Sequence, residues 1–197
     1  MTPQFKKRLV EFYKERYGAE ADRREKSTER LSFSLLILSI IANICLTYLD
    51  NLPSFGRDAI TIIFYIGLLL AMGCGGLAIY FYIRSLVSGY KFWHLPTPLE
   101  ISKYLEKLQA YNITHPDKAM DMENEFEESL AGQYKNFASK NAALNDRRSI
   151  YIYKTSLCSV IAIIILLLCA PLFFYKKHLM TKPPQQVQIV EPVKIQQ

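Results

Sequence analysis

The chain has 197 residues, half of them hydrophobic, and its 24 Lys and Arg residues outnumber its 18 Asp and Glu residues. The apolar residues are gathered into three long runs instead of recurring at period 2 or 3.6, which excludes a disordered chain, a disulfide scaffold and an ordinary cytosolic enzyme. All four cysteines lie inside these runs, as expected of buried thiols. We therefore predict an all-α integral membrane protein, with three transmembrane helices and a cytosolic helical subdomain.

Residues 1–30 are predicted to form a cytosolic, basic, amphipathic helix. Phe5, Leu9 and Phe12 recur at helical spacing, and Lys and Arg occupy the other faces. This stripe indicates either a helix in the interface of an anionic leaflet or a helix docked on other cytosolic helices. Interleaved acids leave a net charge of only +3 over residues 1–31 (nine basic, six acidic), which argues against nucleic-acid binding.

Residues 31–84 are predicted to form a transmembrane hairpin. Its spans, about 31–49 and 59–83, contain no charged residue and reach the roughly 20 apolar residues that a bilayer requires. Thirty largely polar residues precede the first run, which is more than the n-region of a signal peptide, so we expect a retained span.

Small residues recur every four positions in the second span, at Gly67, Ala71 and Gly75. They lie on one helix face and would let a neighbouring backbone approach closely, so we take them as candidate helix-packing residues. The pattern leaves open whether the neighbour belongs to the same chain.

Residues 85–149 are predicted to form a cytosolic helical segment. Trp93 falls where an aromatic belt would lie, and we group it with Phe5, Leu9 and Phe12 as candidate membrane-interface residues. Thr97-Pro98-Leu99-Glu100 reads as a capping box that begins one helix. A second helix begins near Asp117 and is expected to run unbroken into the third span.

The first turns of that second helix are acidic. Glu123, Glu127 and Glu128 could bind a basic protein partner, and a solvated helix face is the alternative interpretation. A continuous helix would couple this segment mechanically to the membrane.

The third span is predicted at 150–175, followed by an extended, Pro- and Gln-rich tail at 176–197. Nine Lys and Arg lie in residues 1–31 and nine in 84–149, against one in 50–58 and four after residue 175. The positive-inside rule therefore predicts a multi-pass protein of the cell inner (plasma) membrane, with a cytosolic N-terminus and an outside C-terminus.

The sequence contains no recognisable catalytic motif. The three histidines are scattered, and no P-loop, G-x-S-x-G or dinucleotide fingerprint occurs. The spans also lack the mid-depth carboxylates, His or Arg of proton relays and coupled transporters. We expect no enzymatic activity and neither a cofactor nor a metal.

The order of parts resembles small membrane effectors of bacterial phage-defence operons, including SLATT-like hairpin proteins. Residues 1–111 look like the charged helix, two-helix hairpin and cytosolic extension of that layout, and AALNDRRSIYIYKTSLCSVIAIIILLL is similar to the polar helix that feeds a last span in many such proteins. The resemblance implies an oligomer that damages the inner membrane when a cytosolic partner senses infection.

Two functional hypotheses follow. The first is an oligomeric, membrane-perturbing or pore-type effector whose partners are the lipid bilayer, further copies of itself and a cytosolic protein, with antiviral defence as the role that the resemblance implies. The alternative is a non-catalytic membrane anchor or scaffold that recruits a cytosolic enzyme complex.

Overall fold

The computed structural model describes residues 3–51 and 58–180, and its regular elements there are all helical, which confirms the all-α prediction. The elements in chain order are α1 (Pro3–Asp50), α2 (Ala59–Ser88), α3 (Pro98–Thr114), the short 3-10 helix η1 (Pro116–Lys118) and α4 (Met122–Met180). Three of them, α1, α2 and α4, are long and apolar enough to cross a membrane.

Two of the helices join segments that differ sharply in composition. α1 runs without a break from the basic N-terminal segment through the first apolar run, over 48 residues. α4 runs over 59 residues from the acidic segment through the third apolar run, so the predicted unbroken helix is confirmed. It begins later than Asp117 because Pro116–Lys118 forms a 3-10 turn, after which the Asp121 carboxylate accepts hydrogen bonds from the backbone N–H groups of Glu123 and Asn124.

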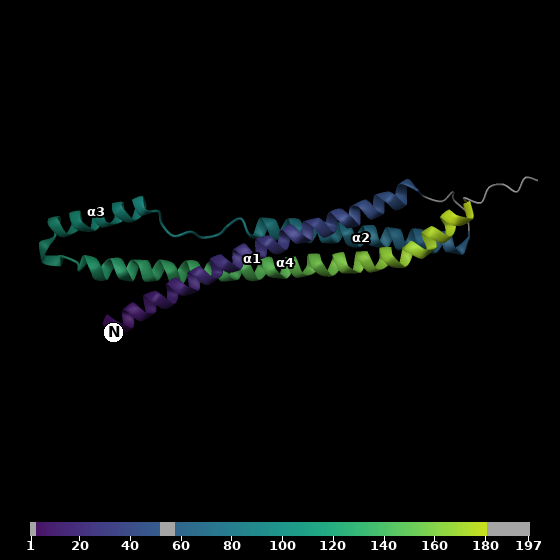
Figure 1. Cartoon of the computed structure of the whole chain (residues 1–197). Helices are drawn as coiled ribbons and strands as arrows, with labels where there is room; N and C mark the ends of the chain where they lie inside the picture. The colour runs from purple at the N-terminus through teal and green to yellow at the C-terminus, as the bar shows by residue number, and fades with distance from the viewer. Residues whose placement is uncertain (1–2, 52–57, 181–197) are drawn as a thin grey trace, which may run out of the picture.

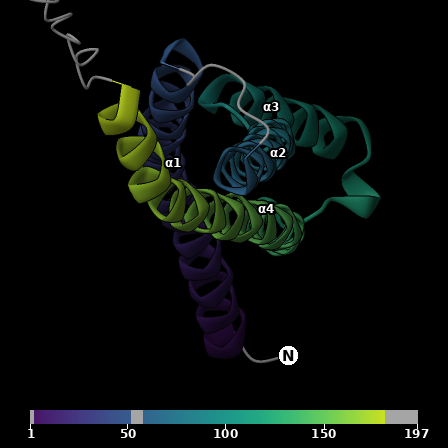
Figure 2. The ribbon, with the colours of Figure 1, turned by 90° about the vertical axis from the view of Figure 1, so that its right-hand side faces the viewer.

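α4 is the central element of an elongated bundle (Figure 1). α2 lies antiparallel beside it, and α1 runs parallel to it and crosses it obliquely (Figure 2). α1 and α2 contact each other much less. α3 packs only lightly on α4 at the far end, where the Thr97–Glu100 capping box is formed as its sequence predicts.

Burial follows a heptad-like spacing in the long helices. In α1 the buried residues alternate in steps of four and three: Ser27, Leu31, Ser34, Leu38, Ile41, Cys45 and Tyr48. The same steps relate buried positions of α4 from Asn141 to Phe173. A mean step of 3.5 residues keeps one face of each helix on its neighbours, as in a coiled coil.

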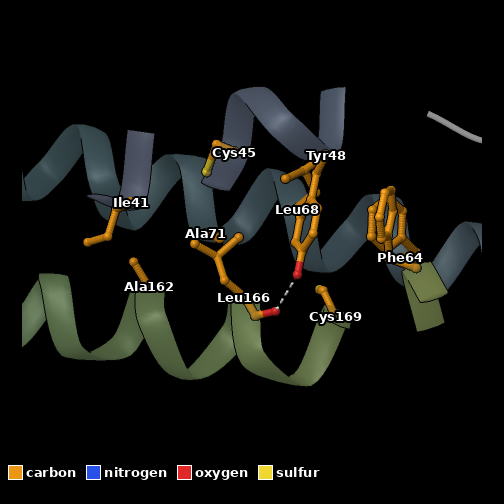
Figure 3. Packing of buried hydrophobic residues seen from close by; sticks show 10 residues of the cluster. Ile41, Cys45, Tyr48, Phe64, Leu68, Ala71, Ala162, Leu166 and Cys169 are labelled. Carbon is orange, nitrogen blue, oxygen red and sulfur yellow. Dashed lines mark hydrogen bonds between the residues drawn. The ribbon is translucent and has the colours of Figure 1, made fainter. Parts of the chain in front are cut away.

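The apolar half of the bundle is packed around aromatic rings and very small side chains. The rings of Tyr48, Phe64 and Phe173 contact one another, with centroid distances of 5.6 Å from Tyr48 to Phe64, 4.8 Å from Tyr48 to Phe173 and 6.0 Å between the two phenylalanines. The Tyr48 hydroxyl donates to the Leu166 carbonyl at 3.3 Å (Figure 3). Ala71 is fully buried in the same cluster, which brings α2 close to α4.

The last turns of α4 correct one predicted boundary. Residues 176–180 continue the helix instead of beginning the extended tail, and the remainder of that predicted tail lies outside the described residues. Lys176 forms an ion pair with Asp58, Nζ to Oδ2 at 2.5 Å, and the Asp58 Oδ1 accepts a hydrogen bond from Thr61. This pair joins the start of α2 to the end of α4.

The Asp58 pair predicts a small acid sensitivity. The hydrogen bonds from Lys176 and Thr61 lower the pKa of the Asp58 carboxyl below its ordinary value. Because the folded pKa is depressed, the stabilisation is complete above the unfolded pKa of about 3.9 and is lost as pH falls through the folded value. Asp58→Asn should therefore narrow the difference between unfolding temperatures at pH 7 and pH 3 in detergent, whereas Asn at exposed Asp50 should leave that difference unchanged.

Candidate functional site

Three polar residues are buried on one face of α4, just before its apolar run. Asn141, Asn145 and Arg148 are 0%, 2% and 5% exposed, and we call them the polar junction. They occupy the heptad-like positions that Ala162, Leu166 and others occupy further along the helix. Buried polar groups require hydrogen-bond partners, so each must be satisfied by a neighbouring segment.

Asn141 holds the loop that connects α2 to α3. Its Oδ1 accepts from the Trp93 backbone N–H at 2.9 Å, and its Nδ2 donates to the Trp93 carbonyl at 3.0 Å. The side-chain amide therefore satisfies both backbone groups of one residue. The Trp93 ring stacks on Phe137 of α4, and its centroid lies 4.0 Å from the Lys140 ammonium. Both the backbone and the side chain of Trp93 therefore contact α4.

Asn145 and its neighbour Asp146 join α4 to α1. The Asn145 Nδ2 donates to both the backbone carbonyl and the carboxylate of Glu20, each at 2.8 Å. Asp146 forms an ion pair with Arg23 at 2.6 Å. The exposed ion pair contributes little by itself, whereas the buried amide sets the register of the two helices.

Arg148 connects all three long helices. Its Nη1 donates to the Arg24 carbonyl at 3.2 Å and its Nη2 to the Thr28 hydroxyl at 3.1 Å, while its own carbonyl accepts from Ser85 of α2 at 3.5 Å. A Cβ at Gly89 would lie 3.2 Å from the guanidinium carbon, so only glycine fits there without a shift.

The Arg148 guanidinium is incompletely compensated. Burial, followed by the nearby Arg24 charge, lowers the pKa of Arg148, which nevertheless stays protonated at neutral pH. Its Nε is buried without a hydrogen-bond partner within the described ranges, and no carboxylate there forms an ion pair with it. A buried cation held by neutral acceptors stabilises the bundle weakly and favours one specific arrangement.

Polar side chains continue from the junction into the apolar half of the bundle. The members are buried Ser34 of α1, Thr61 and Ser85 of α2, and Thr155 and Ser159 of α4. Ser34 and Thr155 donate to carbonyls of their own helices, whereas the Ser159 hydroxyl has no partner in the described part of the chain. We call these five residues the polar seam.

The three predicted helix-packing residues face the chain's own helices. A Cβ at Gly67 would lie 2.5 Å from the Cys169 Sγ of α4, Ala71 is fully buried, and a Cβ at Gly75 would meet Ile41 of α1 at an ordinary 3.7 Å. Gly67 is therefore the tightest of the three positions. The close neighbour belongs to the same chain.

The structure separates the four predicted membrane-interface residues. Phe5 and Phe12 are 54% and 47% exposed, but Leu9 lies against the start of α4. Trp93 belongs to the loop bound by Asn141.

The acidic residues at the start of α4 also differ from one another. Glu128 forms an ion pair with Lys6 of α1 at 3.5 Å, and Glu127 lines the same contact. Lys6 also donates to Asn124 at 2.6 Å. Of the three candidates, Glu123 is exposed and away from this contact, so part of the predicted partner surface is used within the chain.

The pattern that would have revealed the polar junction is the heptad-like spacing of Asn141, Asn145 and Arg148, which continues through Ile152 and Thr155. Over residues 3–51 and 58–180, no group of three or more His, Cys, Asp or Glu side chains could hold a metal ion. Comparison with protein-family models, with curated proteins and with solved structures finds no match to this chain.

Proposed function

We propose that the protein is a non-enzymatic, oligomeric inner-membrane effector, in which a signal received by the cytosolic segment opens the membrane bundle. The observation that carries this proposal is the continuity of α4. One helix contains the polar junction, which binds α1 and the α2–α3 loop, and then part of the polar seam between the spans. A displacement at the junction would be transmitted along α4 into the bilayer.

The polar seam supports permeabilisation as the outcome. Hydroxyls from all three spans lie inside an otherwise apolar bundle, so a bundle that opens or reassembles with further copies would present them to water. Channels are commonly lined by such polar groups while their outer faces remain apolar. In the arrangement described here all five residues are buried, and the hydroxyls of Ser34, Thr61, Ser85 and Thr155 are hydrogen-bonded within the chain.

Because the buried charge of Arg148 is only weakly compensated, its contacts are the ones that we expect to break when the bundle opens. Removing its side-chain contacts should imitate the signal, because the guanidinium joins α1 to α4 and packs on Gly89 after α2. Methionine preserves most of the side-chain volume and removes the charge and its hydrogen bonds.

Purified protein should be reconstituted into dye-loaded vesicles of bacterial lipids. We expect wild type to remain nearly tight and Arg148→Met to release dye at least about tenfold faster, a change that corresponds to about 1.4 kcal/mol. The exposed neighbour Arg147 provides the matched control, since Arg147→Met should behave as wild type. Native mass in detergent should show a discrete homo-oligomer. Equal, negligible leakage from all three proteins, with a soluble enzyme copurifying stoichiometrically, would instead support the anchor hypothesis.

A further inference from the structure

A groove between α1 and α4 lies at the level where both helices change from charged to apolar sequence. It has a volume of about 480 Å³, and its lining includes Glu29, Arg30 and Phe33 of α1 and Ser149, Tyr153 and Ser156 of α4. The first apolar run begins at Leu31 and the third near Ile150. If α1 and α4 span the bilayer, as the proposed function requires, the groove lies at the depth of the inner-leaflet headgroups.

The groove contains polar groups that the protein leaves unused. Within the described ranges, neither Glu29 nor Arg30 takes part in an ion pair, although they are adjacent and both line the groove. The hydroxyls of Ser27, Ser149 and Ser156 make no hydrogen bond there either. Ser27 also lines the groove and is 5% exposed, so its hydroxyl is available to a ligand in the groove.

The arrangement selects a ligand by charge. Arg30 and the hydroxyls can donate to phosphate oxygens, while the Glu29 carboxylate can accept only from a donor such as an ammonium group. The groove lining contains one cation, Arg30, and one carboxylate, Glu29, so its net formal charge is zero. A purely anionic headgroup would leave Glu29 opposite a negative charge, and a quaternary choline has no N–H to donate to it.

The rim of the groove is apolar and suits a lipid better than a soluble phosphate. Phe33 and Tyr153 are 65% and 68% exposed on the two helices, so they can pack on the glycerol and acyl portions of a lipid. We propose that this groove binds a phospholipid whose headgroup carries a phosphate and a primary ammonium, the phosphatidylethanolamine class. The bound headgroup contacts α1 and α4 next to Arg148 and would hold these two helices together.

Native mass spectrometry of the full chain, offered equimolar phosphatidylethanolamine, phosphatidylcholine and phosphatidylglycerol in detergent, tests this directly. We expect wild type to retain phosphatidylethanolamine about tenfold over phosphatidylcholine, the effect of roughly one charge-assisted hydrogen bond. Glu29→Gln should abolish that preference, because the ammonium loses its charged acceptor, and should increase retention of phosphatidylglycerol, because the carboxylate no longer repels an anionic headgroup. Arg30→Gln should instead lower the retention of all three lipids, because each carries the phosphate that Arg30 binds. Arg147→Gln, which removes an exposed cation at the same level outside the groove lining, should retain the preference.

Three results would overturn the lipid site. The first two are equal retention of the three lipids by wild type and equal effects of Arg30→Gln and Arg147→Gln on lipid retention. The third is complete loss of the retained lipid when millimolar soluble phosphoethanolamine is added. Flotation of the same proteins with vesicles separates this proposal from the proposed function. Protein that fails to insert contradicts both, whereas inserted protein that releases dye after Arg148→Met but shows no lipid preference contradicts the lipid site alone.

Discussion

Replacing Gly67 by alanine should destabilise the bundle by about 1–3 kcal/mol, the usual effect of overpacking a filled core. The added Cβ would lie 2.5 Å from the Cys169 Sγ, closer than real Cβ contacts, and Cys169 is itself only 4% exposed. Either the cysteine must rotate within packed surroundings or α2 must move away from α4. The unfolding temperature in detergent, followed by fluorescence-detected size exclusion, measures the effect.

Matched controls lie on the same helix. A Cβ at Gly73 or Gly76 would meet nothing within 4 Å, so alanine there should leave stability unchanged or raise it slightly. Cys169→Ala removes the atom that Gly67→Ala strikes, and the double variant should be less destabilised than the sum of the single changes. Equal effects at Gly67 and Gly73, or simple additivity with Cys169→Ala, would contradict close α2–α4 packing at this point.

Asn141→Ala should detach the α2–α3 loop from α4. The substitution removes both hydrogen bonds from Asn141 to the Trp93 backbone. It leaves the Trp93 N–H without this acceptor, leaves the Trp93 carbonyl with the longer bond from the Tyr17 hydroxyl at 3.4 Å, and vacates space in the core, so we expect a loss of about 2–4 kcal/mol in the free energy of unfolding. Trp93 is the single tryptophan of the sequence, so its fluorescence reports on this loop directly. We expect a red shift of its emission and faster amide hydrogen exchange around Trp93.

The control for Asn141 is another asparagine of α4. Asn136 is exposed, and Asn136→Ala should leave the tryptophan emission and the exchange rates unchanged. Asn141→Asp keeps an acceptor for the Trp93 N–H but loses the donor for its carbonyl, so its effect should be intermediate. A shared emission spectrum for Asn141→Ala and Asn136→Ala would show that the side-chain amide does not hold the loop.

Much of the helical framework could be predicted from the sequence because its determinants are local. Hydrophobicity over a window of about 20 residues identifies an apolar helix, and the Thr97–Glu100 capping box involves residues only three positions apart. The continuity of α4 was also predictable from local sequence, since no residue between the acidic segment and the apolar run breaks a helix. The boundary at residue 176 was wrong because α4 continues to Met180, beyond the last apolar residue of the run, and the contact of Lys176 with Asp58 joins residues distant in sequence.

The candidate site depended on distant pairs. The acidic stripe of α4, considered by itself, left Glu128 either on a partner surface or on a solvated face, whereas Lys6 of α1 forms an ion pair with it across the fold. The same approach missed Asn141 and Arg148, because a polar residue in a charged segment appears solvated until the neighbouring helix covers it.

Three long apolar segments, their all-helical character and one helix start could thus be predicted without a structure, since these follow from hydrophobicity and hydrogen bonding within a few turns. The packing of the helices was needed to show that Gly67 meets Cys169, that Asn141 binds the Trp93 backbone and that Arg148 joins three helices. The physical reason is that close packing and buried hydrogen bonds depend on which helix faces are brought together, and residues separated by tens of positions carry no local signal of that pairing.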